Sequence, residues 1–147
     1  MKALLQRVTS SKVSVGQDVI GEIGAGLTVL LGVFPDDTQK DIDKLAEKVI
    51  NLRIFDDKDG KMNLSLVDVK GEILIISQFT LCGDCKKGRR PSWAKAAAPE
   101  YANEMYLKFI EAVKSRGIRV GHGQFQAHMS VEIHNDGPVT LLIDTRE

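Results

Sequence analysis

The chain has 147 residues, of which 43% are hydrophobic, and its 20 basic and 20 acidic side chains give a net charge of zero. This composition excludes a disordered chain, two cysteines exclude a disulfide scaffold, and the apolar run Leu27–Val33 is far shorter than the roughly 20 residues of a membrane-spanning helix. Because Met1–Arg7 turns polar too early for a signal peptide, we expect one cytoplasmic domain over residues 1–147 without membrane contact.

The first 33 residues predict three strands. Lys2–Val15 is rich in Val, Leu, Thr and Ser, Asp18–Ile23 is a short second strand, and Leu27–Val33 has the continuous apolar pattern of a buried strand. The glycine-rich segment Gly21–Gly26 lacks the spacing of the dinucleotide-binding fingerprint, and a strand rather than a helix follows it. We therefore predict a tight turn between two strands there.

Two helices are predicted farther along the chain. The first is indicated by apolar residues at spacings of three and four, with Thr38 and Asp41 fitting a capping box. Its apolar residues are Ile42, Leu45, Ala46, Val49 and Leu52. The second begins at Pro99, a residue that suits the first helical position, and stops at Gly117. Its apolar stripe is Ala102, Met105, Tyr106, Phe109 and Val113.

Further strands are predicted over Glu72–Leu81 and in the C-terminal part. Phe125–His134 alternates strictly, with apolar residues at odd positions and polar residues at even ones. Asn135–Pro138 predicts a turn into a last strand, Val139–Asp144. Seven or eight strands with two main helices predict an α+β domain, with a largely antiparallel sheet rolled into a barrel-like core.

The apolar strand ends with two hydroxyls, an amide and an aromatic ring, at Ser77, Gln78, Phe79 and Thr80. Two hydroxyls and an amide at the end of a buried strand must be hydrogen-bonded or used in chemistry, and strand-end capping is the simpler interpretation. Neither hydroxyl lies in a nucleophile-elbow sequence, and no His–Asp pair is recognisable. The sequence therefore does not predict a conventional catalytic triad.

A basic segment follows, with Lys86, Lys87, Arg89 and Arg90 close together and no acid among them. Gly88 and Pro91 keep this segment out of regular structure, so we expect an exposed loop. Its function would be to bind phosphates, although a solvated charged loop is an equally good interpretation of the charges alone.

Cysteine and histidine do not form a complete metal site. Cys82 and Cys85 make half a zinc site with no second pair, and two of the three histidines, His128 and His134, fall on the polar face of one predicted strand. We therefore expect no metal and no cofactor, and the sequence leaves open whether the two cysteines pair.

The dipeptide Gly137–Pro138 could contain a cis peptide bond. The cis form of an X-Pro bond costs only about 0.5–1 kcal/mol and occurs typically in tight turns. A cis bond would turn two rigid carbonyls in a direction that a trans turn cannot reach. The spacing alone favours an ordinary turn.

Taken together, these segments resemble the D-aminoacyl-tRNA deacylases. Two motifs carry the resemblance, Ser77–Leu81 and Asn135–Thr140, supported by Leu5–Val8, Gly21–Gly24, Gly60–Asn63 and Arg90–Ser92. It extends over nearly the whole chain. The cysteines at 82 and 85 are a departure, and they affect only their own loop.

The resemblance implies a homodimer that hydrolyses the ester of D-aminoacyl-tRNA, and also glycine mischarged on tRNA-Ala. The Gly137–Pro138 bond would be cis and would reach into the partner subunit's pocket, where it holds the amino group and rejects L side chains. Ser77, Gln78, Phe79 and Thr80 would line the ester. Phe125 and Met129 would contribute to the pocket.

Two chemical hypotheses follow for the hydrolysis. Thr80 acts as the nucleophile, or backbone amides near Phe79 and Thr80 form an oxyanion hole while the 2′-hydroxyl of the tRNA assists the attack. We favour the second, because the sequence shows no general base beside Thr80.

Two other functional classes remain as alternatives. The chain could be a non-catalytic RNA-binding module that uses the basic loop, or a general esterase that uses Ser77 and a histidine.

Overall fold

The structure is a computed structural model that describes all residues from 1 to 147. Its strands are β1 (Lys2–Val15), β2 (Asp18–Ile23), β3 (Gly26–Gly32), β4 (Phe55–Asp56), β5 (Met62–Leu64), β6 (Glu72–Ser77), β7 (Val120–His122) and β8 (Met129–Asp144). The helices are α1 (Gln39–Asn51) and α2 (Pro99–Lys114), with a short 3-10 helix, η1 (Phe79–Cys82).

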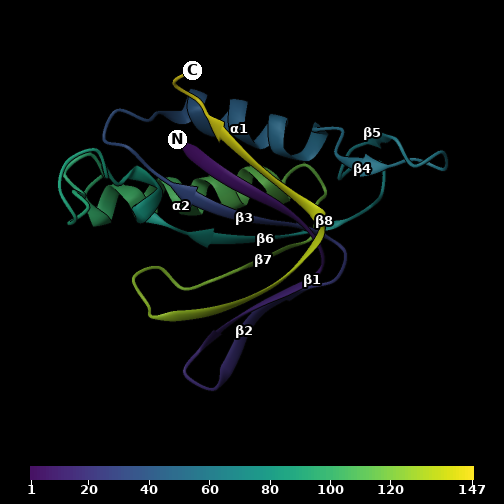
Figure 1. The fold of residues 1–147 in the computed structure, drawn as a ribbon, viewed down its shortest axis with the longest axis horizontal. Coiled ribbons are helices and arrows are strands. Elements are labelled where there is room, and N and C mark those ends of the chain that lie inside the picture. Colours follow the sequence, from purple (N-terminus) through teal and green to yellow (C-terminus); the bar gives the residue numbers. More distant parts are fainter.

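The long strand β1 organises the main sheet. One of its edges pairs with β8 from end to end, and its other edge pairs first with β3 and then with β2, all antiparallel. Strands β3, β6 and β7 are parallel to one another. Figure 1 shows β1 and β8 bending together away from the helices toward β2. A Cβ at Gly21 would lie 2.7 Å from the carbonyl oxygen of His122, so β2 approaches β7 closely and the barrel-like sheet nearly closes.

The main core lies between the sheet and the two helices, which cover the same face (Figure 1). Side chains on one face of β1, β3 and β6 pack there against apolar residues of both helices. A second, smaller cluster lies on the other face of the sheet, inside its curve, and includes Val8, Val13 and Leu74. No helix combines the length and apolar character that crossing a bilayer requires. The α+β fold class with two main helices is confirmed.

Several local predictions are also confirmed. The Thr38 amide donates to Asp41 Oδ2 at 2.8 Å, which completes the capping box of α1, and Pro99 occupies the first turn of α2. A Cβ at Gly26 would lie only 1.8 Å from the backbone oxygen of Glu72. Glycine is therefore required at the start of β3, where the backbones of β3 and β6 approach closely. The predicted tight turn lies between β2 and β3.

The strand predicted over Glu72–Leu81 is too long. β6 ends at Ser77, the amide of Gln78 donates to Leu31 O at 2.7 Å, and the next residues form η1 through local bonds to Gln78 O and Thr80 O. The side chains of the Ser77–Leu81 motif are thus presented from a strand end and a helical turn.

The strand predicted to begin at Phe125 begins four residues later in the structure, at Met129. Gln126 has a φ of +64°, and the amide of Ala127 donates to Gln124 O at 3.2 Å, so this segment turns before β8 starts at Met129. The alternation at Phe125–His128 therefore coincides with a turn instead of a strand.

The prediction of a turn at Asn135–Pro138 is wrong. The chain does not reverse there, because the residues on both sides pair with the same edge of β1. The extra residues form an irregularity within β8, with register shifts on each side of Val8.

Candidate functional site

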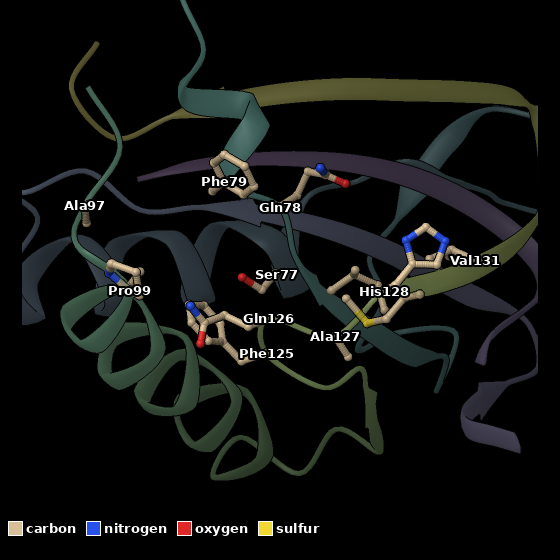
Figure 2. Close-up of a pocket in the computed structure, with 13 residues that line it drawn as sticks. Ser77, Gln78, Phe79, Ala97, Pro99, Phe125, Gln126, Ala127, His128 and Val131 are labelled. Carbon is tan, nitrogen blue, oxygen red and sulfur yellow. The ribbon is translucent and has the colours of Figure 1, made fainter. Parts of the chain in front are cut away.

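A cavity of about 560 Å³ opens where β6 ends, and Figure 2 shows its lining. The lining comes from the end of β6, the start of η1, the N-terminal part of α2 and the segment before and within β8. Its 13 residues are Ile76, Ser77, Gln78, Phe79, Ala97, Pro99, Ala102, Phe125, Gln126, Ala127, His128, Met129 and Val131. The predicted site residues Ser77, Gln78, Phe79, Phe125 and Met129 are brought together here.

The turn that follows β6 leaves two backbone donors without an acceptor. η1 begins directly after the strand, and the first amides of a helix have no acceptor within it. Leu81 N and Gly83 N are the donors in the turns around η1, whereas no hydrogen bond outside the regular elements starts at Phe79 N or Thr80 N. These two amides are therefore available to an oxygen atom bound near Phe79.

Tyr106 supports the cavity from α2. Its hydroxyl donates to Ile75 O at 2.9 Å, and its ring lies 6.2 Å from the ring of Phe125, centroid to centroid. Burial raises the pKa of Tyr106 to about 12, so the phenol stays protonated at neutral pH. Tyr106 therefore supports β6 through a hydrogen bond and Phe125 through the contact of their rings.

The hydroxyls of the motif have no general base. Thr80 is exposed and does not line the cavity, and its Oγ1 accepts from Gln78 Nε2 at 2.5 Å. Ser77 and His128 both line the cavity, but no hydrogen bond joins them. The other histidine hydrogen bonds connect His122 to Gly123 O and His134 to Ser10. The cavity lining also contains no carboxylate.

The cysteines are both free thiols. Cys82 is buried with its Sγ 3.4 Å from Val33 O, and burial raises the pKa of its thiol, whereas Cys85 is exposed. The chain contains no group of three or more His, Cys, Asp or Glu side chains placed to hold a metal ion.

Gly137 and Pro138 lie outside the cavity of their own chain. Both are exposed in the irregular part of β8, the peptide bond between them is cis, and Gly137 has a φ of +119°. Asn135 braces this part, because its Nδ2 donates to Arg7 O at 3.0 Å and to Val139 O at 3.1 Å.

Arg7 is a positioning residue that the sequence analysis did not identify as one. Its side chain is 7% exposed, and its guanidinium donates from Nε to Asp136 O at 3.2 Å and from Nη1 to Ile54 O at 2.8 Å. The available signal was its place in β1, where it alternates with the buried Ala3 and Leu5. A buried charged side chain needs hydrogen-bonding or ionic partners.

The basic loop is exposed as predicted and lies outside the cavity. Asp84 and Ser92 exchange both backbone hydrogen bonds at 2.9 Å, and this bridge closes the loop that carries Lys86, Lys87, Arg89 and Arg90. No acidic side chain forms an ion pair with any of these four.

An apolar row crosses the face of the sheet that points away from the helices, and sequence alone could not locate it. Leu4 lies between Leu30 and Leu142 in the pairing of three strands, and Leu142 is 58% exposed. Strand β8 pairs only with β1, so its other edge is open. Open strand edges and exposed leucines are features that a partner commonly covers.

Sequence comparisons match the chain to tRNA deacylases. A family described as D-Tyr-tRNA(Tyr) deacylase matches residues 4–144. A D-aminoacyl-tRNA deacylase of Fervidobacterium nodosum is 60% identical over 147 residues, covering 100% of this chain and 99% of the relative. One from Clostridioides difficile is 57% identical over 145 residues, covering 99% and 97%.

Two solved structures share the fold. One titled c-Myc DNA Unwinding Element Binding Protein has a TM-score of 0.93 and 42% identity, and covers 99% of each chain. One titled as a probable eukaryotic D-amino acid tRNA deacylase has a TM-score of 0.85 at 19% identity, and covers 97% of each chain.

Replacing Arg7 tests its bracing role. We expect Arg7→Met to lower the free energy of unfolding by about 2–3 kcal/mol, because one buried and one partly buried backbone carbonyl lose their donor, and the ion pairs with Asp56 and Asp136 are also lost. Arg53→Met is the matched control, since Arg53 is exposed and bonds only to Asn63; its loss should be below about 1 kcal/mol. Urea unfolding measures both, and equal small losses would contradict the assignment.

Proposed function

Because the chain belongs to the D-Tyr-tRNA(Tyr) deacylase family, we propose that it hydrolyses the ester bond of D-aminoacyl-tRNA and releases the free D-amino acid and tRNA. The observation that carries this proposal is the cavity at the end of β6, which gathers Ser77, Gln78 and Phe79 of the sequence motif beside Phe125 and Met129. A hydrolysis of this kind takes place in the cytoplasm, where aminoacyl-tRNA is made and used.

The reaction centre in this proposal lies at the start of η1. The carbonyl oxygen of the ester accepts from the amides of Phe79 and Thr80, which have no acceptor in the helical turn. These donors stabilise the negative charge that develops on that oxygen during attack. The terminal adenosine's own 2′-hydroxyl assists the attack, since neither Ser77 nor Thr80 has a base within hydrogen-bonding distance.

The active unit in this proposal is a homodimer. Gly137 and Pro138 are exposed and do not line their own chain's cavity, whereas the apolar row at Leu4, Leu30 and Leu142 and the open edge of β8 offer a surface for a second copy. The Gly137–Pro138 segment of one subunit then closes the cavity of the other. Arg7 fixes the segment from behind.

This closure provides the chiral selection. Rejecting an L-substrate by about 10⁴-fold requires about 5.5 kcal/mol, whereas one methylene in an apolar pocket supplies only about 1–3 kcal/mol. A wall of backbone atoms held by Arg7 and Asn135 cannot relieve a clash by rotating a side chain. It binds the amino group and leaves a D side chain free to point outward. Glycine has no side chain to reject, so glycine mischarged on tRNA-Ala is also a substrate.

The proposal is tested by incubating the protein with D-Tyr-tRNA and L-Tyr-tRNA. We expect the D-ester to be hydrolysed and the L-ester to persist. Tight binding of both without hydrolysis would indicate a non-catalytic RNA-binding module. Cleavage of small activated esters, with labelling by a fluorophosphonate, would instead indicate an esterase that uses Ser77.

The role of Thr80 can be tested together with the role of the RNA. Thr80→Ala should keep kcat/KM on D-Tyr-tRNA within about threefold, whereas a 2′-deoxy terminal adenosine should abolish turnover, a loss of at least ~10²-fold. Single-turnover assays measure both. Loss of most activity in Thr80→Ala, with fold and tRNA binding retained, would show that the hydroxyl is the nucleophile.

The basic loop is proposed to bind tRNA phosphates. Replacing Lys86, Lys87, Arg89 and Arg90 by alanine should weaken tRNA binding and flatten its dependence on salt, by about 0.7–0.9 in the logarithmic slope for each phosphate that the loop no longer neutralises. The ratio of D to L hydrolysis should not change. The control replaces four exposed lysines elsewhere, Lys40, Lys48, Lys58 and Lys61. An unchanged slope in the loop variant would contradict this role.

A further inference from the structure

Two large aromatic rings lie exposed at the rim of the cavity. Phe79, which lines the cavity, is 55% exposed, and Trp93, which does not, is 43% exposed. Their centroids are 5.5 Å apart with the planes at 71°, an edge-to-face arrangement. The pair therefore extends the apolar lining from inside the cavity onto the outer surface.

The ring of Trp93 is held in place by the residues that close the basic loop, Gly83, Asp84 and Ser92. The Asp84–Ser92 bridge ends one residue before Trp93, and Asp84 also accepts from Lys95 Nζ at 3.0 Å. A Cβ at Gly83 would lie 2.5 Å from Cζ3 of the indole, so the ring packs directly on the backbone of Gly83. A ring fixed in this way loses little conformational entropy when a ligand stacks on it.

The surroundings of the pair are strongly basic. The loop that the Asp84–Ser92 bridge closes carries Lys86, Lys87, Arg89 and Arg90, all exposed and without an acidic partner. No acidic residue occurs between Cys85 and Ala98. This end of the molecule, at the left in Figure 1, therefore combines aromatic faces with free positive charge.

We propose that Phe79 and Trp93 form a stacking platform for the unpaired nucleotides that precede the terminal adenosine of the tRNA. This inference rests on the proposed function, because an ester bound in the cavity requires the RNA strand to leave across the cavity's rim. The bases stack on the aromatic faces while the loop neutralises the phosphates, which is the usual chemistry of single-strand recognition. Stacking accepts any base, so the platform positions the RNA without reading its sequence.

Trp93 itself reports on this site, because it is the only tryptophan in the chain. Titrating the full-length protein with the trinucleotide CCA should quench its fluorescence, whereas adenosine monophosphate, which is too short to leave the cavity, should not at the same occupancy. Equal quenching by both would overturn the platform, and so would the absence of quenching by bound CCA.

Substitutions of Trp93 separate the effect of an aromatic ring from the effect of side-chain volume. Trp93→Leu should weaken binding of CCA and raise KM for D-Tyr-tRNA about tenfold with kcat unchanged, and Trp93→Phe should stay within about threefold of the wild type. An unchanged KM in Trp93→Leu, or equal losses in both variants, would overturn the inference. Failure of the wild-type protein to hydrolyse D-Tyr-tRNA would refute the proposed function itself, whereas hydrolysis without an effect at Trp93 refutes only the platform.

Discussion

The cavity depends first on the parallel pairing of β3 with β6. Residues Ile73–Ile76 are buried in the middle of the sheet, and β7 covers the second edge of β6, so this strand has little freedom to move. Its last bond, from Gln78 N to Leu31 O, fixes the point where the chain leaves the sheet. The amides of η1 therefore follow directly after a buried central strand that is paired on both edges, and donors fixed in this way can stabilise a developing charge.

The second half of the proposed site comes from a different constraint. The pairing of β8 with β1 continues across the irregular segment at Gly137–Pro138, and Arg7 fills the space behind it with hydrogen bonds to two backbone carbonyls. These two halves do not meet within one chain, because Gly137 and Pro138 are absent from the cavity lining. In the proposed homodimer, a second copy brings the cavity and the Gly137–Pro138 segment together.

The sequence predicted what depends on local pattern. The helices were predicted because apolar spacing, the Thr38–Asp41 cap and Pro99 act within a few residues of one another. The motif around Ser77 was recognised from the resemblance to a family, whereas the end of β6 is set by a bond to Leu31, which is distant in the sequence.

What the sequence missed depends on contacts between distant segments. Asn135–Pro138 has the composition of a turn, but its pairing with β1 keeps the chain running in one direction. The apolar row at Leu4, Leu30 and Leu142 comes from the register of three strands, which no local pattern contains. The role of Arg7 likewise required the position of the carbonyl groups of Ile54 and Asp136.

The most direct test of completion by a second copy is a mixture of two variants, each inactive alone. Ser77→Phe fills the cavity that Figure 2 shows, and Gly137→Ala places a Cβ 2.9 Å from Arg7 Nη2 at a φ of +119°. If the projection acts in the partner's cavity, a mixed dimer has one intact site, and hydrolysis of D-Tyr-tRNA should return when the two variants are refolded together. No recovered activity, with mixed dimers shown to form, would contradict the account.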